Sequence, residues 1–307
     1  MQESTKSLKK ENILKKIIAT AGETKRLINR YKFQIKKKLG QNFIIEPRII
    51  ERIIESANID KEDIVVEIGP GMGSLTQGLA ENAGYVIAIE LDQNLIPILE
   101  DSFGKYENVN IIHGDALKVD YNKLLNEIPN QNNYKEGFVV VANLPYYITT
   151  PITMNLLEGN YPWRKLVLMV QKEVAERMKA VPGTKDYGAL SIGVQYRATA
   201  HIAMNIPPTV FIPRPAVDSA IVVLDRLPKP SVEVKDENLF FRLVKAAFGQ
   251  RRKTLLNSVS SGLHIDKSIL LTALKNAEID EKRRGETLSL EEFGRLADEI
   301  FKIKEII

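Results

Sequence analysis

Residues 143–148, NLPYYI, combine groups that could prepare an aromatic amine for chemistry. The N6 amine of adenine is a poor nucleophile because its lone pair is delocalised into the ring. If the side-chain oxygen of Asn143 and the main-chain carbonyl of Leu144 each accept one N6 hydrogen, the nitrogen is drawn towards pyramidal geometry. Pro145 can stiffen this turn, and Tyr146 can stack on the base, a contact worth about 1 to 3 kcal/mol. The segment predicts a catalytic site for an adenine amine; a plain proline turn with a buried aromatic pair is the alternative.

Residues 66–73, VEIGPGMG, predict the loop that holds the electrophile. Glycines let the backbone pass close to a ligand and leave the amides of a following helix free. A dinucleotide fingerprint places its third glycine three positions after the second, whereas Gly69, Gly71 and Gly73 are evenly spaced. Glu67 would repel a pyrophosphate but attract a cationic amino group. S-adenosylmethionine has such an amino group and no phosphate, so the pattern favours it over a nicotinamide dinucleotide.

Two further carboxylates follow the next two predicted strands. Glu90 lies about twenty residues after the glycines, where a carboxylate accepts the ribose hydroxyls of a nucleotide cofactor. Asp115, in the segment HGDAL, could accept a hydrogen bond from the adenine amine of that cofactor. An isolated aspartate in a turn is more often a local capping residue. The order of these acids at successive strand ends favours a shared cofactor site.

The elements that must position these residues form an alternating pattern. Short β-branched runs alternate with longer helical stretches, which is typical of a parallel sheet buried on both faces. The expected strands are residues 64–68, 85–90, 109–112, 138–142 and 166–170. Residues 190–206 and 220–227 leave little room for a helix between them, so we expect an antiparallel pair that closes the sheet. The predicted fold is α/β, with a mostly parallel seven-stranded sheet.

Composition and length limit the other possibilities. The chain has 307 residues, 44% hydrophobic and 27% charged, which is enough for a full core and a small second domain. It has no cysteine and three histidines, so disulfides and thiolate chemistry are excluded and no metal site is expected. The N-terminus lacks an apolar run of signal-peptide or membrane-span length, so the expected location is cytoplasmic, with no membrane partner.

We expect three parts in the chain. Residues 228–234, PKPSVEV, predict a linker before segments of helical periodicity. The parts are a basic N-terminal extension (1–35), a cofactor-binding domain (36–227) and a helical C-terminal domain (228–307). Residues 1–38 carry a net charge of +9 and the remainder −5, which suggests attraction to phosphates. A solvated helix face and a mitochondrial presequence are alternatives, and the three acidic residues of this stretch disfavour the second.

From about residue 36 to residue 290, the chain resembles the ribosomal RNA adenine N6-dimethyltransferase family, specifically its bacterial small-subunit (16S) dimethyladenosine transferase branch, linked to kasugamycin sensitivity. The segments that carry the resemblance are KKLGQNFI (37–44), VEIGPGMGSLT (66–76), AIELD (88–92), GDAL (114–117), NLPYYI (143–148), FIPRPAVDSAI (211–221) and FGQRRKTLLNS (248–258). The resemblance implies a Rossmann-like class I methyltransferase domain, a small all-helical C-terminal domain that binds RNA, and S-adenosylmethionine as cofactor.

The resemblance also implies roles for individual residues. The implied cofactor-binding residues are Gln41, Asn42, Ile44, Gly69, Gly71, Glu90, Asp115 and Asn143. Among them the two glycines approach the methionine part, and Asn143 serves both the cofactor and the target side. Ile44 stands where the family commonly has leucine, which should leave a backbone contact intact.

Two sets of residues are implied to contact RNA. Phe211, in the segment FIPRP, could form the second face of a sandwich around the target base, although a core phenylalanine is an equal alternative. The cluster Arg251, Arg252 and Lys253 looks like an RNA-backbone contact, with a solvated helix face as the alternative.

The implied reaction is N6,N6-dimethylation of two adjacent adenosines in a hairpin near the 3′ end of small-subunit RNA. The expected partner is that RNA within the 30S subunit or its precursor, and the expected oligomeric state is a monomer. Alternatives are the antibiotic-resistance branch acting on large-subunit RNA, a DNA adenine methyltransferase, a ribosome assembly factor with secondary catalysis, and, more distantly, a nicotinamide oxidoreductase. FGQRRKTLLNS favours the small-subunit branch.

Overall fold

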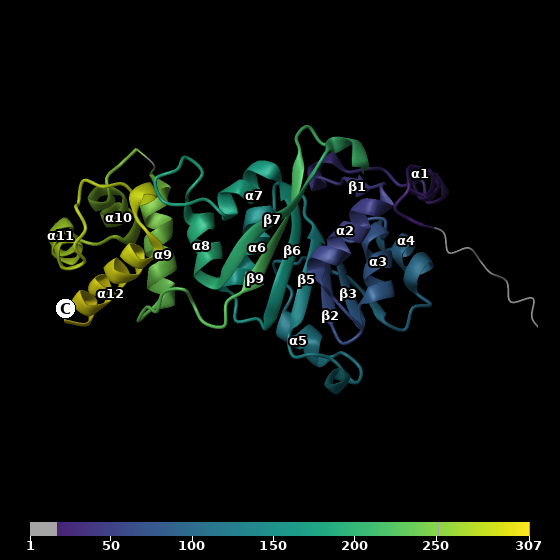
Figure 1. Cartoon of the computed structure of the whole chain (residues 1–307), viewed down its shortest axis with the longest axis horizontal. Coiled ribbons are helices and arrows are strands. Elements are labelled where there is room, and N and C mark those ends of the chain that lie inside the picture. The colour runs from purple at the N-terminus through teal and green to yellow at the C-terminus, as the bar shows by residue number, and fades with distance from the viewer. Residues whose placement is uncertain (1–16, 251, 307) are drawn as a thin grey trace, which may run out of the picture.

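A seven-stranded sheet forms the centre of the computed structural model, which describes residues 17–250 and 252–306. Segment 1–16 of the predicted basic extension, and Arg251, lie outside the described residues. The strands of the sheet are β2 (Ile64–Ile68), β3 (Tyr85–Glu90), β4 (Val109–His113), β5 (Phe138–Asn143), β6 (Trp163–Gln171), β7 (Ala198–Ile206) and β9 (Ser219–Arg226). They lie in the order β4-β3-β2-β5-β6-β9-β7 (Figure 1). The mostly parallel seven-stranded sheet is therefore confirmed.

Only one strand of this sheet runs against the others. Strands β4, β3, β2, β5 and β6 are parallel, and β9 pairs antiparallel with β6 on one side and β7 on the other. A separate two-stranded ladder joins β1 (Phe43–Ile44) to β8 (Phe211–Ile212), with Ile44 opposite Phe211. This short ladder brings the N-terminal segment of the domain beside the loop that precedes β9.

Helices cover both faces of the sheet because alternate strand residues point to opposite sides. Val65, Val139 and Val167 pack in one core with the helices α2 (Pro47–Ala57) and α3 (Ser74–Asn82). On this side α1 (Ala21–Arg30) and α4 (Ile96–Phe103) share a smaller cluster. The opposite core contains the helices α5 (Tyr121–Asn126), α6 (Thr149–Glu158), α7 (Lys172–Met178) and part of α8 (Ala189–Arg197).

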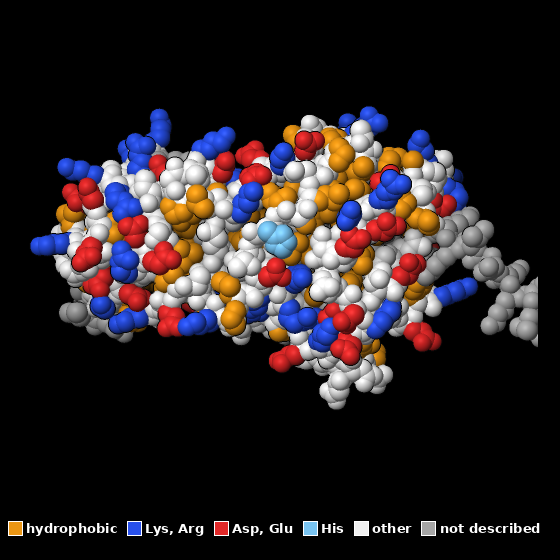
Figure 2. Space-filling view, in the orientation of Figure 1, with side chains coloured by type: hydrophobic (Ala, Val, Ile, Leu, Met, Phe, Trp, Pro, Cys, Tyr) orange, Lys and Arg blue, Asp and Glu red, His pale blue; other side chains and the backbone are white. Residues whose placement is uncertain are grey.

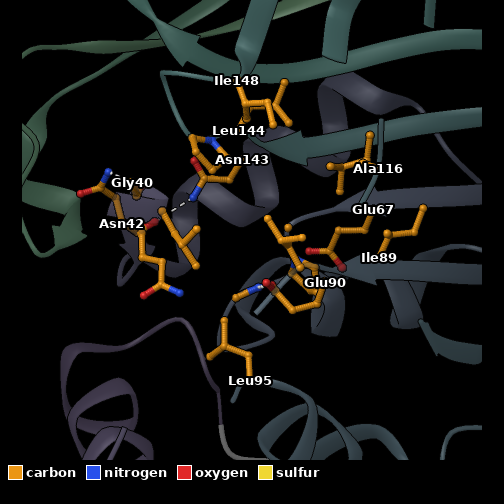
Figure 3. A pocket seen from close by; sticks show the side chains of 18 of the residues that line it. Gly40, Asn42, Glu67, Ile89, Glu90, Leu95, Ala116, Asn143, Leu144 and Ile148 are labelled. Carbon is orange, nitrogen blue, oxygen red and sulfur yellow. Dashed lines mark hydrogen bonds between the residues drawn. The ribbon is translucent and has the colours of Figure 1, made fainter. Parts of the chain in front are cut away.

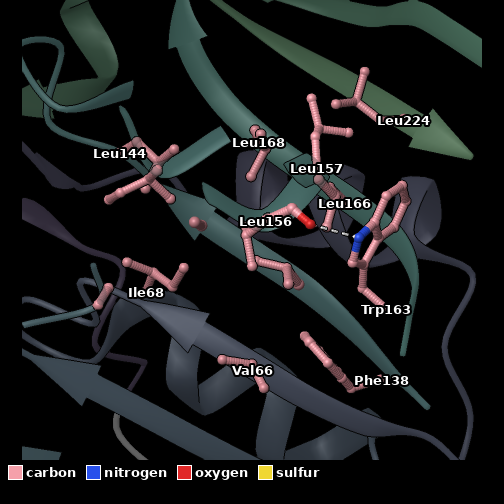
Figure 4. Close-up of a cluster of buried hydrophobic side chains, with 14 of the residues drawn as sticks. Val66, Ile68, Phe138, Leu144, Leu156, Leu157, Trp163, Leu166, Leu168 and Leu224 are labelled. Carbon is pink, nitrogen blue, oxygen red and sulfur yellow. Dashed lines mark hydrogen bonds between the residues drawn. The ribbon is translucent and has the colours of Figure 1, made fainter. Parts of the chain in front are cut away.

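Figure 4 shows this second core, in which the neighbours of those valines, Val66 and Leu166, point towards the other helices. Trp163 is 1% exposed, and its indole N–H donates to the carbonyl of Leu156 at 2.8 Å. The bulkiest side chain of the core is thus buried with its only polar group satisfied.

The prediction of one extended run over residues 190–206 was wrong in its first half. Residues 189–197 form α8, and only 198–206 form β7. Leu190 and Val194, four residues apart, pack on the sheet, whereas Ile192 and Tyr196 pack on the C-terminal helices. Both of these faces of α8 are buried, and its polar side chains Ser191 and Gln195 donate to main-chain carbonyls of residues 177–180. The segment therefore has no solvent-facing polar stripe and looks like a buried strand. The antiparallel pairing of the shorter β7 with β9 is confirmed.

The C-terminal region is helical, as predicted. It contains α9 (Glu237–Gly249), α10 (Leu255–Leu263), α11 (Lys267–Asn276) and α12 (Leu290–Ile306). These helices share a core with three side chains of the preceding domain, Tyr187, Ile192 and Tyr196. A boundary at residue 228 stays a prediction, since the core of the C-terminal helices includes these three side chains, which precede residue 228.

Candidate active site

A pocket of about 1050 Å³, counted with its open mouth, lies at the carboxyl ends of β2, β3 and β5. Strand order reverses between β2 and β5, and ligands of open α/β sheets bind at such a point. All predicted cofactor, catalytic and stacking residues line it: Gln41, Asn42, Ile44, Gly69, Gly71, Glu90, Asp115, Asn143, Leu144, Pro145, Tyr146 and Phe211. Figure 3 shows Asn42, Glu90, Asn143 and Leu144 among them.

The glycine loop has a backbone that other residues rarely adopt. Gly69, Gly71 and Gly73 have φ of +73°, +60° and +87°. A Cβ on Gly71 would lie 3.0 Å from the ring of Phe43, and one on Gly73 would collide with the ring of Phe103. The even spacing of the glycines thus reflects three left-handed residues in one turn, which ends at the first residue of α3.

The variant Gly73→Ala is expected to lose more stability than Gly183→Ala. Gly183 has a similar φ of +84° but open space around its Cβ position, so it isolates the backbone cost. That cost is about 1–3 kcal/mol, and the collision with Phe103 should add about 1–3 kcal/mol at Gly73. Urea unfolding of both variants checks this, and equal losses would contradict it.

Glu90 ties the glycine loop to the end of β3. One carboxylate oxygen accepts the N–H of Gly71 at 3.2 Å, and the other accepts the N–H of Asp92 at 2.7 Å. Burial raises the pKa of Glu90, while these main-chain donors lower it in part. Each oxygen keeps capacity for a second donor, such as a hydroxyl group.

Glu67 is the least satisfied polar group in the pocket wall. It is 1% exposed, and among the described residues neither of its oxygens has a hydrogen-bond partner of ordinary geometry. Burial raises the pKa of Glu67 to about 8; the nearby hydroxyl of Thr76 offsets part of this rise, and the charge of Glu90 adds to it. Figure 3 shows Glu67 and Glu90 on the same side of the pocket. A buried carboxyl without a donor fits a ligand that carries a cationic amino group.

The variant Glu67→Gln is expected to stabilise the ligand-free protein above neutral pH. The folded pKa of about 8 exceeds the ordinary 4.5, so the folded protein holds a proton that the unfolded chain releases. Wild-type stability should therefore fall as pH rises between these values, by up to about 1.4 kcal/mol per pH unit. Urea unfolding at pH 5, 7 and 9 measures the difference, and parallel pH profiles would contradict it.

The control for this experiment is Glu292→Gln, in the C-terminal helices. Arg283 lowers the pKa of Glu292, so this carboxyl contributes stability that is present at neutral pH and lost as pH falls through its folded pKa. Its replacement should lower stability at neutral pH, which is the opposite sign to Glu67→Gln.

The turn after β5 presents two acceptors to the pocket. The side-chain amide of Asn143 donates to the main-chain carbonyl of Asn42 at 2.8 Å (Figure 3), so its oxygen points away from that bond. The N–H of Leu144 donates to the carbonyl of Met169 at 3.1 Å. Within the part of the chain that the structure describes, no donor takes the side-chain oxygen of Asn143 or the carbonyl of Leu144. Both residues line the pocket, so these oxygens are unpaired acceptors at its wall.

The two tyrosines of this turn differ in exposure. Tyr146 is half-buried, and its hydroxyl makes a 2.7 Å hydrogen bond with that of Ser219, the first residue of β9. Burial raises the pKa of Tyr146. Tyr147 also lines the pocket but is 56% exposed. Sequence reasoning missed Tyr147 and Ser219, although both lie in quoted motifs.

The remaining predicted residues are more constrained than expected. Phe211 lines the pocket but is 2% exposed and packs in the α2–α3 core. One oxygen of Asp115 accepts the N–H of Leu117 at 3.0 Å, which is a capping contact. Arg252 and Lys253 are exposed between α9 and α10.

Comparison with known proteins identifies the family. The family model described as ribosomal RNA adenine dimethylase matches residues 32–299. A ribosomal RNA small subunit methyltransferase A of Alkaliphilus oremlandii is 51% identical over 286 residues, 93% of this chain and 98% of that protein. The protein of the same name from Bacillus pumilus is 50% identical over 94% of this chain and 99% of its own length.

Solved structures agree with this match. A dimethyladenosine transferase from Plasmodium falciparum superposes with a TM-score of 0.70 at 29% identity, covering 85% of this chain and 98% of that one. The 23S rRNA methyltransferase ErmE superposes with a TM-score of 0.59 at 25% identity, covering 84% of this chain and 99% of its own. No described helix has the length and apolarity to cross a membrane. The chain thus belongs to the ribosomal RNA adenine dimethylase family, and is an S-adenosylmethionine-dependent rRNA adenine dimethyltransferase.

Proposed function

We propose that this protein dimethylates the N6 amines of two adjacent adenosines in a hairpin near the 3′ end of small-subunit (16S) ribosomal RNA, within the 30S subunit or its precursor. The observation that carries the chemistry is the pair of available acceptors, Asn143 and Leu144, at the mouth of a pocket that fits the cofactor. The small-subunit assignment rests on 51% identity to a relative named for that subunit, against 25% to a 23S rRNA enzyme.

Different pocket residues bind different parts of the cofactor. Glu67 pairs with the cationic amino group, beside the Gly69–Gly71 turn at the methionine part. Glu90 accepts the ribose hydroxyls with its remaining capacity. Asp115 accepts the adenine amine with the oxygen that Leu117 does not use, which lies 3.8 Å from the ammonium of the exposed Lys118. Gln41, Asn42 and Ile44 close the pocket from the N-terminal side. S-adenosylmethionine supplies an electrophilic methyl group on a sulfonium sulfur.

The target adenine is activated by position and not by a strong base. Asn143 and Leu144 each accept one N6 hydrogen, which turns the nitrogen lone pair towards the methyl group. Pro145 stiffens the turn, since its own carbonyl accepts the N–H of Ile148 at 3.1 Å and the hydroxyl of Thr149 at 3.2 Å. Tyr146, anchored on Ser219, stacks on a base flipped out of its helix, and Phe211 limits the opposite side. The proton of the methylated ammonium is acidic enough to leave to water.

The C-terminal region (228–307) is the proposed RNA-binding domain. Arg252 and Lys253, with Arg251, would neutralise backbone phosphates. Figure 2 shows basic side chains gathered along the edge of this helical end, and Figure 1 places α10 beside that edge. We infer a cytoplasmic monomer whose pocket stays open to a folded RNA.

The double variant Arg252→Ala/Lys253→Ala is expected to weaken binding of small-subunit RNA by losing two phosphate contacts. The slope of log affinity against log salt concentration should fall by about 2, while cofactor affinity stays unchanged. RNA binding at several salt concentrations measures this. The control replaces Lys267 and Lys275, two exposed lysines of α11, with alanine; an equal change in slope would contradict the assignment.

The test of the proposed function is transfer of labelled methyl from S-adenosylmethionine to undermethylated small ribosomal subunits, with large subunits and duplex DNA as parallel acceptors. Nucleoside analysis should find dimethyladenosine only in small-subunit RNA, at two positions. Label in large-subunit RNA would overturn the choice of subunit. Cofactor binding without transfer to any acceptor would overturn the catalytic proposal and favour an assembly role.

A further inference from the structure

One buried carboxylate outside the predicted site holds the N-terminal wall of the pocket. Residues 36–44, here called the strap, supply six of the residues that line the pocket: Leu39, Gly40, Gln41, Asn42, Phe43 and Ile44. The carboxylate of Asp92, two residues after Glu90, has no exposed surface and accepts the ammonium of Lys36 at 2.7 Å and the amide of Gln41 at 2.8 Å. The side-chain oxygen of Gln41 in turn accepts the N–H of Lys36 at 2.8 Å. These three bonds close a ring at the start of the strap.

The middle of the strap is fixed against the catalytic turn. Gly40 has a φ of +60°, and a Cβ there would lie 3.2 Å from the Cβ of Pro145. The next contact is the carbonyl of Asn42, which accepts the amide of Asn143. The strap ends at Ile44, whose carbonyl accepts the hydroxyl of Ser74 at 3.1 Å and which pairs with Phe211 in the β1–β8 ladder.

These bonds connect the cofactor side of the pocket to the target side. Glu90 accepts the N–H of Asp92, Asp92 accepts the side chain of Gln41, and the neighbouring Asn42 orients Asn143. Loss of the Asp92 carboxylate would free the start of the strap. The carbonyl of Asn42, which holds the amide of Asn143, would then be less firmly positioned.

We propose that Asp92 is a positioning residue for methyl transfer, which latches the strap over the cofactor and thereby sets the orientation of the Asn143 amide. The proposal rests on the role of Asn143 proposed above. Burial raises the pKa of Asp92, but hydrogen bonds from Lys36, Asn94 and Gln41 outweigh this effect and lower the pKa overall. The carboxylate is therefore charged at neutral pH.

The test compares Asp92→Asn with the matched control Asp63→Asn. As whole residues, Asp63 and Asp92 are each 2% exposed. Asp63 accepts Arg164 at 2.5 Å and the N–H of Asp60 at 2.8 Å, but it precedes β2 at the far end of the sheet. Amide hydrogen exchange of the strap and the dissociation constant of S-adenosylhomocysteine are measured on the full chain at a temperature where both variants stay folded. Neither readout needs RNA, so a failure of the proposed substrate would leave this result interpretable.

We expect Asp92→Asn to speed exchange across the strap and to raise the dissociation constant by about tenfold or more, because charge-assisted bonds are lost. At saturating cofactor, its kcat should stay reduced while the KM for RNA changes little. Asp63→Asn should lower the melting temperature without either effect. Lys36→Met, at a position where the side chain is 43% exposed, should show a smaller effect of the same kind. Strap exchange and cofactor affinity equal to those of Asp63→Asn would overturn the proposal.

Discussion

The variant Asn143→Ala is expected to reduce kcat for methylation of small-subunit RNA by about 100–1000-fold, the range seen when one preorganised polar group is removed from an active site. It removes one of two acceptors for the target amine and also the bond to the carbonyl of Asn42. Because the Glu90 and Glu67 contacts remain, affinity for S-adenosylhomocysteine should change by less than about tenfold. Single-turnover methylation at saturating cofactor separates the chemical step from binding.

The matched control for this prediction is Asn122→Ala. Its side-chain amide also donates to a main-chain carbonyl, that of Asn160 at 3.2 Å, but it belongs to α5 and does not line the cofactor pocket. It should keep the wild-type rate. A loss of cofactor binding as large as the loss of rate in Asn143→Ala would contradict the assigned role, since it would place the residue on the cofactor side only.

The centre of the sheet could be predicted because its inner strands, such as β2 and β5, are buried on both faces. Runs such as residues 138–142 are β-branched and apolar throughout, and each ends at a residue of different character. Since parallel strands end at one edge, the polar residues that follow them had to meet, and Glu90, Asp115 and Asn143 do line one pocket. The predicted assignment of these positions to one site needed only the strand order.

Contacts across long stretches of sequence could not be predicted in the same way. The Asp92 carboxylate is bonded to residues 51 and 56 positions away, and nothing in the segment AIELD distinguishes it from a solvent-exposed acid. The collision that requires Gly73 comes from Phe103, on α4. The two-residue ladder of β1 and β8 is too short to leave a periodic pattern.

The helix α8 illustrates a different limit. Periodicity detects a helix through the contrast between an apolar and a polar face. Leu190 and Val194 face the sheet and Ile192 and Tyr196 face the C-terminal helices, so tertiary packing removes that contrast. Only knowledge that the core of the C-terminal helices lies against α8 would have distinguished this helix from the strand β7 that follows it.

The variant Glu90→Ala is expected to weaken binding of S-adenosylmethionine by about 100-fold or more, because hydrogen bonds to a charged group contribute about 1.5–3 kcal/mol each. The loss has two parts. The ribose hydroxyls lose their acceptor, and the N–H groups of Gly71 and Asp92 lose theirs, which loosens the glycine loop and the base of the strap together. Titration calorimetry, with circular dichroism to verify the fold, measures the change.

Glu292→Ala provides the control for the second part of that loss. Glu292 is part-buried, whereas Glu90 is buried, but like Glu90 it accepts a main-chain N–H, that of Ser289 at 2.8 Å, and it lies in the C-terminal helices. It should lose stability and keep cofactor affinity. If Glu90→Ala bound the cofactor as tightly as Glu292→Ala does, the carboxylate would be only a structural link between Gly71 and Asp92. The variant Glu90→Gln keeps the size of the side chain but removes one acceptor, because its amide nitrogen would face a main-chain donor. If this variant also kept its cofactor affinity, Glu90 would again be only a structural link.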